Sequence, residues 1–272
     1  WNLVKRLSPH SYSIIEFKNK KDLKIVQAMY RSPLLSDHHT TWKISWNAEL
    51  HMTNDSDVFN TKNEGLVLYE GKMIEQYTNK FEQPRYWVNE NNAQKKFGKM
   101  YKDYNEYRLA FRAVASSTNR RTMIATILPK NVFVGNSLIV SKVYENGNRI
   151  ISNERLLYLC GIFNSFILDY LLRLKVTTNI NMFFIYELPI PNISETDTRF
   201  KKIVKNVAKL ICTSTEFNDL KKEIGIENGI KDETERMKIN KEIEDTVKEF
   251  YGLTDDDHNY IKKLFKNEET PQ

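Results

Sequence analysis

Basic and aromatic side chains alternate through one segment of the sequence, from Lys80 to Arg121. The segment holds ten lysines and arginines against four acidic residues, and eight aromatic residues lie among them. Cations neutralise phosphates and release counterions, while aromatic rings and arginine side chains contact bases and sugars. The alternative is a solvated charged surface over a core of aromatic residues. The pattern therefore favours a polyanionic partner, with nucleic acid as the first choice.

Two polar segments could present hydrogen-bonding groups to phosphates and bases. The first runs from Ser116 to Thr122 and places hydroxyls, an amide and two guanidinium groups on one loop between strands. The second, Val176 to Asn181, follows a strongly apolar stretch. Short hydroxyl side chains contact phosphates, and arginine can bind guanine through two hydrogen bonds. Ordinary connecting loops have a similar composition, so both interpretations stay open.

Asp57, Glu70 and Lys72 form the pattern that most resembles catalysis. Mg²⁺-dependent nucleases use an acid, then a strand, then Glu-x-Lys, so that carboxylates hold the metal and the lysine polarises the attacking water. Gly71 predicts a tight turn, which would separate Glu70 from Lys72. The sequence contains no glycine-rich phosphate loop, zinc-ligand cluster or nucleophile elbow. A metal nuclease is therefore an alternative to nucleic-acid recognition.

The composition is that of a globular protein with a substantial core. Hydrophobic residues make up 40% of the 272 positions, enough for one large or two modest domains. The net charge of +6 and the isoelectric point near 9.0 agree with a polyanionic partner. Cys160 and Cys212 lie in apolar helical patterns, which predicts buried thiols in a reducing compartment, and we expect the cytoplasm. The sequence has no charge-free run of about twenty apolar residues, which is the pattern that would predict a membrane-spanning helix.

Hydrophobic periodicity predicts an α+β protein. We expect a mixed or antiparallel, β-rich recognition domain with one buried helix over residues 1–197, followed by a helical region over residues 198–272. Short strands are expected at Tyr12–Phe17, Leu66–Tyr69, Tyr104–Val114, Met123–Leu128, Val132–Val134, Val140–Tyr144 and Phe183–Leu188, with a hairpin turn at Asn146-Gly147-Asn148. Helices are expected at Lys21–Tyr30, Arg155–Arg173, Thr198–Ser214, Glu233–Tyr251 and Asp255–Phe265. Alternation within Tyr104–Val114 places Arg108, Ala110, Arg112 and Val114 on one side of a half-buried strand.

Several blocks resemble the specificity region of fused type II restriction–modification enzymes. These are adenine-specific DNA methyltransferases with a TaqI-like C-terminal target recognition domain. The most specific block runs from Leu68 to Tyr77, and the resemblance covers about residues 42–265. The other blocks are His51–Ser56, Tyr107–Arg112, Ser116–Thr122, Ile127–Pro129 with Asn136–Leu138, Gly161–Phe166 through Arg173 to Leu188–Pro191, and Ile243–Glu244 through Phe250–Thr254. The run ending at Pro191 is also similar to type I specificity subunits.

The resemblance implies sequence-specific recognition of double-stranded DNA by a chain that is not catalytic alone. The family's Asn-Pro-Pro-Tyr turn, which grips a flipped adenine, is absent, and so is a glycine-rich turn for S-adenosylmethionine. Because the chain begins at Trp1 rather than Met, we expect a longer parent whose methyltransferase domain binds S-adenosylmethionine, with a fused endonuclease as a further option. No cofactor is expected in this chain. The family places Glu70-Gly71-Lys72 within the recognition domain, which argues against the nuclease alternative.

In this interpretation phosphate contacts set the register on the duplex and a few side chains read base edges. The helical region is expected to pack on the recognition domain, on the methyltransferase domain, or on a second copy as a homodimer. A protein-interaction domain with an acidic partner remains as another alternative, and no membrane contact is expected. The residues expected to contact DNA are Lys72, Gln76, Arg85, Arg108, Arg112, Ser116, Thr118, Asn119, Arg120, Arg121, Thr122, Thr177 and Asn179, with Asn119, Thr122 and Gln76 as base readers.

Overall fold

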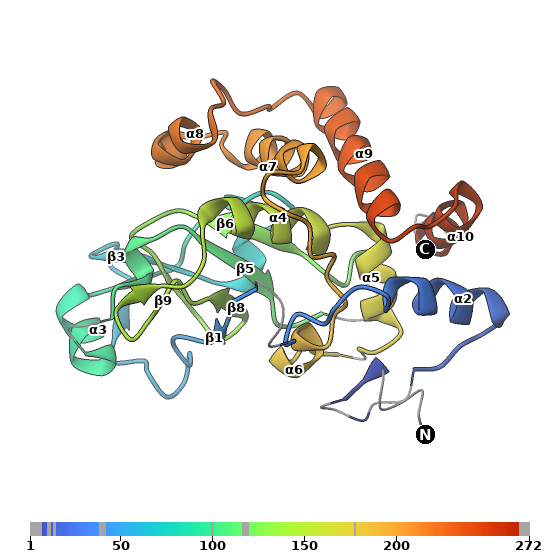
Figure 1. Cartoon of the computed structure of the whole chain (residues 1–272). Helices are drawn as coiled ribbons and strands as arrows, with labels where there is room; N and C mark the ends of the chain where they lie inside the picture. Colours follow the sequence, from blue (N-terminus) through green and yellow to red (C-terminus); the bar gives the residue numbers. More distant parts are fainter. Residues whose placement is uncertain are drawn as a thin grey trace.

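The computed structural model describes residues 7–9, 12, 15–37, 42–98, 101–115, 120–176 and 178–266. Two four-stranded sheets lie beside each other, and helices cover their outer sides (Figure 1). A buried layer joins the two sheets, with Ala110 and Leu138 from the first and Tyr69 and Val134 from the second. The predicted α+β class is confirmed.

The first sheet is antiparallel throughout, with the strand order β1-β8-β5-β6. The strands span Trp46–Asn47 (β1), Leu138–Ser141 (β8), Arg108–Arg112 (β5) and Ala125–Leu128 (β6). Central β5 is buried on both faces: Leu109 and Phe111 join the large helical core, while Ala110 faces the second sheet. The alternation predicted for this strand is therefore real, but neither face of it meets solvent.

The second sheet has the order β2-β4-β3-β7, in which only the β3–β7 pairing is parallel. Its strands are Phe59–Asn60 (β2), Tyr86–Val88 (β4), Leu66–Tyr69 (β3) and Phe133–Val134 (β7). The helix α3 (Glu90–Phe97) packs on its outer face through Ala93. Asn89 starts this helix because its side chain accepts hydrogen bonds from two free backbone N–H groups. The 3₁₀ turns η1 (Gly71–Met73) and η2 (Asp103–Asn105) follow β3 and precede β5.

The hairpin predicted at Asn146-Gly147 is confirmed. Strands β9 (Tyr144–Glu145) and β10 (Asn148–Arg149) pair on either side of these two residues. Asn146 and Gly147 have φ angles of 50° and 77°. Two positive φ angles are what a two-residue type I′ turn requires, and asparagine and glycine adopt them at low cost.

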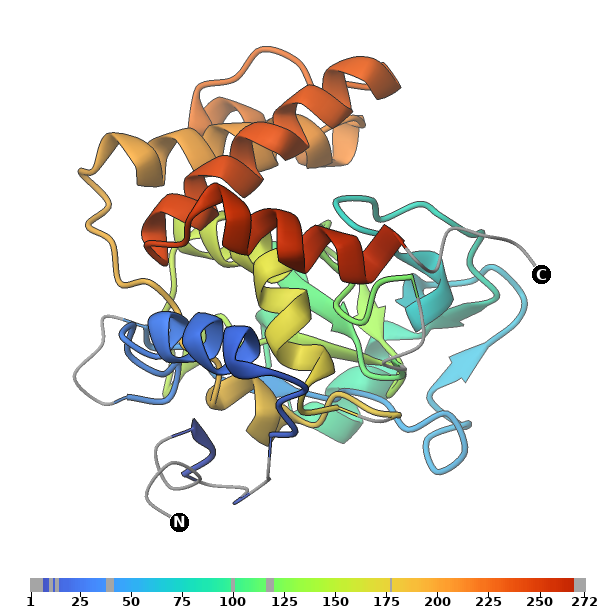
Figure 2. The same ribbon diagram turned by 90° about the vertical axis from the view of Figure 1, so that its right-hand side faces the viewer.

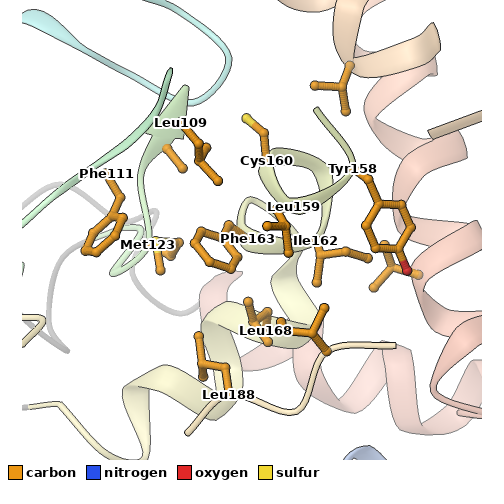
Figure 3. Close-up of a cluster of buried hydrophobic side chains, with 14 of the residues drawn as sticks. Leu109, Phe111, Met123, Tyr158, Leu159, Cys160, Ile162, Phe163, Leu168 and Leu188 are labelled. Atoms are coloured by element: carbon orange, nitrogen blue, oxygen red, sulfur yellow. The ribbon is translucent and has the colours of Figure 1, made fainter. Parts of the chain in front are cut away.

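The long buried helix predicted at Arg155–Arg173 is two helices, α4 (Asn153–Phe163) and α5 (Phe166–Arg173), bent by 65°. The break lies at Asn164 and Ser165. The Asn164 side chain donates to the Ala125 carbonyl at 2.8 Å and accepts from the Ala125 N–H at 3.0 Å, and Ser165 caps α5. Polar bonds to β6 therefore replace helical ones at this point, and α4 packs against the first sheet (Figure 3).

The C-terminal region packs against α4 and α5. It comprises α7 (Thr198–Ile211), η3 (Thr215–Phe217), α8 (Asn218–Ile224), α9 (Glu233–Phe250) and α10 (Asp255–Lys266). Both views show α7 and α9 above α4 (Figures 1 and 2). The rings of Tyr158 and Phe200 stack 4.8 Å apart, and those of Phe166 and Phe265 meet edge to face at 4.9 Å. One hydrophobic cluster thus contains residues from both sides of position 197.

Of two further predicted elements, the helix is confirmed and the strand is wrong. The helix predicted at Lys21–Tyr30 is α2 (Lys20–Met29), which Asn19 caps. Phe183–Leu188, predicted as a strand, contains the short helix α6 (Met182–Tyr186) and joins the rest through an isolated bridge from Leu34 to Pro189. Aromatic residues favour strands, but here the surrounding contacts override that preference. The described part of Tyr12–Phe17 forms no strand either.

Cys160 and Cys212 are buried thiols, as predicted. Burial raises the pKa of the Cys212 thiol to about 12. Among the described residues no single helix is long and apolar enough to cross a membrane. The bent pair α4–α5 meets that criterion by length and composition when taken together, and its side chains are largely buried in the core.

Candidate nucleic-acid interface

Arg108, the first residue of β5, lies wholly inside the protein. Its guanidinium group pairs with the Glu49 carboxylate and donates to the Val132 carbonyl at 2.5 Å. Glu49 also accepts from the Val134 N–H at 2.7 Å and from the Tyr101 hydroxyl. A side chain without exposed surface cannot reach a phosphate, so we remove Arg108 from the DNA contacts. Its charge instead joins β5 to the second sheet.

Arg121 and Thr122 also make their contacts inside the protein. The Asp169 carboxylate, fully buried on α5, accepts from Arg121 Nε at 2.5 Å and from the backbone N–H groups of Thr122 and Met123 at 3.1 and 3.2 Å. The Arg121 guanidinium also lies 4.2 Å from the Phe166 ring centre. Thr122 is fully buried. Neither residue is free to read DNA, and both are removed from the predicted contacts.

Arg112 and Gln76 are half-buried, and their side chains form hydrogen bonds with backbone carbonyls of neighbouring segments. Arg112 Nε donates to the Gly71 carbonyl at 2.9 Å and Nη2 to the Ile74 carbonyl at 2.5 Å, which fixes η1 against β5. Gln76 Nε2 donates to the Met123 carbonyl at 3.1 Å. The amide that was expected to read a base thus holds the backbone. Both residues, and the backbone that Arg112 holds, belong to the surface defined below.

Lys72, Arg85 and Arg120 keep exposed side chains or exposed parts of them. Lys72 lies 3.5 Å from a Glu82 carboxylate oxygen. Arg85 forms two hydrogen bonds with Glu70, of 2.6 and 3.0 Å. Ion pairs with solvent access contribute little to stability, so Lys72 and Arg85 can each exchange a carboxylate for a phosphate.

The segment directly before the first polar loop pairs with part of the second polar loop. Residues 113–115 pair with residues 178–180 through an antiparallel bridge between Val114 and Asn179. Two backbone hydrogen bonds flank the bridge, from Ala115 N–H to the Thr178 carbonyl at 3.1 Å and from Ile180 N–H to the Ala113 carbonyl at 2.8 Å. Asn179, a predicted contact, is exposed there. The predicted contacts that lie outside the described residues are Ser116, Thr118, Asn119 and Thr177.

Further hydrogen bonds connect this two-segment ribbon to its neighbours. Ser137 accepts from Gly71 N–H through its hydroxyl and from Ala113 N–H through its carbonyl, both at 2.9 Å. Arg173 Nη2 donates to the Arg120 carbonyl at 2.7 Å, which leaves the Arg120 side chain exposed. We call the resulting surface the loop end, and define it as residues 71–76, 112–115, 120–122, 135–137 and 178–180.

The loop end carries a positive charge. Its ranges contain four cations and one acid, Glu75. Asp169 beneath them neutralises Arg121, which leaves a net balance of about two positive charges over a small surface. A positive surface of this kind raises the local concentration of polyanions. The arrangement can therefore hold phosphates while the exposed groups of the ribbon meet other parts of the ligand.

The geometry around Glu70 and Lys72 differs from the one that a metal nuclease needs. Strand β3 ends at Tyr69, and Lys72 lies within the 3₁₀ turn η1, so the strand does not present the two side chains together. The Glu70 carboxylate is occupied by Arg85. In the part of the chain that the structure describes, no group of three or more His, Cys, Asp or Glu side chains could hold a metal ion.

Comparisons with known proteins give only distant likenesses. No family model matches the sequence, and no curated protein does so. The structure is similar to that of the type IIL restriction-modification enzyme MmeI in complex with DNA, with a TM-score of 0.48 and 12% identity over 86% of this chain and 37% of that one. It is also similar to a chain of a type I restriction–modification system, with a TM-score of 0.34 and 13% identity over 92% and 55%. This chain thus spans less than two thirds of either protein.

Three exposed residues of the loop end were not among the predicted contacts: Val114, Asn136 and Thr178. Val114 is the apolar one. It is the last apolar position in the alternation of Tyr104–Val114, directly before the polar loop. Its side chain is 64% exposed. An apolar residue that continues a strand's pattern past the strand's end is the feature that could have identified it.

Proposed function

We propose that this chain is the double-stranded DNA recognition domain of a restriction–modification enzyme, and that its loop end contacts the duplex. One observation carries the proposal: the bridge between Val114 and Asn179 joins the segment directly before the first polar loop to the second polar loop, at the end where Arg120 is exposed and Lys72 is partly exposed. The sequence resemblance to target recognition domains covers these loops and supports the same conclusion.

In this mechanism Lys72, Arg85 and Arg120 bind phosphate oxygens and release counterions. Their present carboxylate neighbours, Glu82 and Glu70, give way because exposed ion pairs are weak. The phosphate contacts fix the position and orientation of the domain. The ribbon of residues 113–115 and 178–180 can then reach the base edges.

We further propose that the parent enzyme methylates adenine, with the catalytic domain and the S-adenosylmethionine site outside this chain. The chain has no Pro-Pro pair, and its nine glycines form no glycine-rich turn. Its part in the reaction is therefore to place the target sequence in register. Methylation assays of the parent with and without residues 42–265 would test this role: loss of site selection, rather than of S-adenosylmethionine binding, is the expected result.

The test of DNA recognition is a salt titration of duplex binding. Fluorescence anisotropy with a random-sequence duplex should show log K falling linearly between about 50 and 200 mM salt, with a slope of about −0.9 for each phosphate contact. The double variant Lys72→Ala/Arg120→Ala should flatten the slope by roughly 1.8. A charge-matched control, Lys201→Ala/Lys241→Ala, changes exposed lysines on α7 and α9 and should leave the slope unchanged. An affinity independent of salt, or an equal effect of the control, would contradict the proposal.

A further inference from the structure

The bridge between Val114 and Asn179 fixes the direction of both side chains. The flanking backbone hydrogen bonds run from residue 115 to residue 178 and from residue 180 to residue 113. That pattern makes Val114 and Asn179 a non-hydrogen-bonded antiparallel pair, in which the two Cα atoms are about 4.5 Å apart and the side chains are close. Directly opposed residues of such a pair project to the same face. The two side chains therefore act as one unit.

That face is the exposed one. Ala115 and Ile180, the next residues on each segment, are 2% and 1% exposed, so alternation turns the opposite face inward. Val114 has the largest exposed fraction among the exposed large apolar side chains of the described residues. The Asn179 side chain makes no hydrogen bond within the described part of the chain. A rigid branched apolar group thus stands beside an available amide.

The first segment of the ribbon continues from a strand end that is anchored before any ligand binds. Arg112, at the end of β5, is bonded to the Gly71 and Ile74 carbonyls, and Arg120 is held through its own carbonyl by Arg173. A side chain contact with a base needs this kind of preorganised support, because the cost of ordering the segment is met within the folded protein.

An adenine–thymine pair presents the matching chemistry in the major groove. Adenine offers N7 as acceptor and N6 as donor, which an asparagine amide can bind together, and thymine offers a 5-methyl group that apolar side chains contact. The major groove also admits a two-stranded β-ribbon. A guanine–cytosine pair has no methyl group and presents two acceptors on guanine, so one amide cannot satisfy it in the same way.

We infer that Asn179 and Val114 together read one adenine–thymine base pair in the major groove. The Asn179 amide binds adenine N7 and N6, and the Val114 methyl groups contact the thymine methyl group. The inference rests on the proposed function and adds the base preference of the same surface. Lys72, Arg85 and Arg120 contribute affinity that is the same for all sequences.

The experiment begins with sites selected by the intact chain from a random duplex library. The selected sites should share an A·T pair at one position. Replacing that thymine by uracil removes only the methyl group, and should weaken binding by the intact protein about fourfold. Replacing the adenine by 7-deazaadenine removes the N7 acceptor. Asn179→Ala should lose about ten- to a hundredfold of the preference for A·T over other base pairs at this position. Its binding should no longer change when 7-deazaadenine replaces the adenine.

A thermodynamic cycle separates a direct contact from a general loss of binding. Val114→Ala should weaken binding to the thymine duplex about as much as uracil does, and uracil should then have no further effect. Val114→Thr keeps one methyl group and should retain part of the difference. Met237→Ala, which shortens a 62% exposed side chain on α9, should change neither quantity.

The outcomes distinguish the two proposals. If the chain shows no salt-dependent duplex binding, the proposed function fails and this inference fails with it. If it binds with the expected salt dependence but selects no A·T pair, only the base-reading inference is overturned. It is also overturned if uracil weakens the intact protein and Val114→Ala equally, because the methyl group then has no contact with Val114. Melting curves of each variant confirm that the ribbon substitutions leave the fold intact.

Discussion

Two arginines of the same basic segment, Arg108 and Arg85, each pair with a glutamate, and the two pairs have opposite roles. In the first, Arg108 and Glu49 have no exposed side-chain surface. In the second, the Arg85 side chain is 53% exposed and that of Glu70 10%. The residue types are the same in both pairs, so identity alone does not decide whether a cation is available to a ligand. Burial decides it.

The difference follows from the cost of removing charge from water. Inside the protein Glu49 is satisfied by a guanidinium, a backbone N–H and a hydroxyl, and these bonds offset a desolvation penalty of several kcal/mol per ion. If either partner is lost, the other charge stays unpaired in an interior that water does not reach. In the second pair the Arg85 side chain is in contact with water, so Arg85 can change from Glu70 to a phosphate at a lower cost than Arg108 can leave Glu49.

The largest expected effect is therefore at the buried pair. Arg108→Met should lower the free energy of unfolding by about 3–5 kcal/mol, because Glu49 stays buried without its cation. Urea unfolding followed by tryptophan fluorescence measures this loss. The double variant Arg108→Met/Glu49→Leu removes both charges and should recover much of the stability. A loss smaller than about 1 kcal/mol would place Arg108 among ordinary surface positions and remove the contrast with Arg85.

Asp169 should show the next largest effect. Asp169→Ala removes the acceptor of the Arg121 side chain and of two backbone N–H groups, and we expect a loss of about 2–4 kcal/mol in urea unfolding. The matched control is Asp245→Ala, whose carboxylate pairs with Lys241 near the surface of α9 and should change stability by less than about 0.5 kcal/mol. Equal losses at the two positions would show that burial is not the cause.

The sequence could predict the pattern of β5 but not what covers it. Alternation correctly placed Arg108, Ala110 and Arg112 on one side of the strand. A polar side next to an apolar one normally indicates solvent, but here the second sheet lies over it. Glu49 is 59 positions away from Arg108 in the sequence, and no local pattern connects the two.

For the helices and the candidate site, too, the sequence predicts the features that depend on neighbouring residues and not those that depend on distant contacts. Capping residues and apolar periods gave α2, α7, α9 and α10 close to their observed bounds, because those features act within a few residues. The break at Asn164 was missed because it depends on hydrogen bonds to Ala125. The sequence identifies both polar loops, but the pairing of Val114, just before the first loop, with Asn179 in the second is a contact between distant residues that only the fold creates.

A third test concerns Asp22, a buried acid of α2 that accepts a hydrogen bond from Tyr170 of α5. Burial acts to raise the pKa of this carboxyl, but hydrogen bonds from Tyr170, Tyr260 and two backbone N–H groups hold its pKa below the usual value of 3.8. A lowered pKa stabilises the fold at pH values above 3.8, and the benefit is lost as the pH falls below it.

Asp22→Asn should accordingly cost about 1–2 kcal/mol at neutral pH, since charged hydrogen bonds are replaced by neutral ones. The difference between the parent protein and this variant should stay constant down to about pH 5 and shrink below about pH 4. Thermal unfolding across this range measures it. A difference that grows on acidification would mean that folding raises the pKa of this carboxyl instead of lowering it, which contradicts its role as an ionised anchor.

The smallest change in stability is expected at Arg85, and this variant sharpens the comparison most directly. Arg85→Ala removes an exposed partner from Glu70, so the urea midpoint should not change measurably, in contrast to Arg108→Met. Its effect should appear in DNA binding instead, where the salt slope should flatten by about 0.9 if the side chain binds one phosphate. Arg85→Lys keeps the charge and should restore the slope, although a lysine cannot form both bonds with Glu70. If Arg85→Ala destabilises the fold as strongly as Arg108→Met while leaving the salt slope intact, the outer pair is a structural brace like the inner one, and the phosphate contacts must be assigned to Lys72 and Arg120 alone.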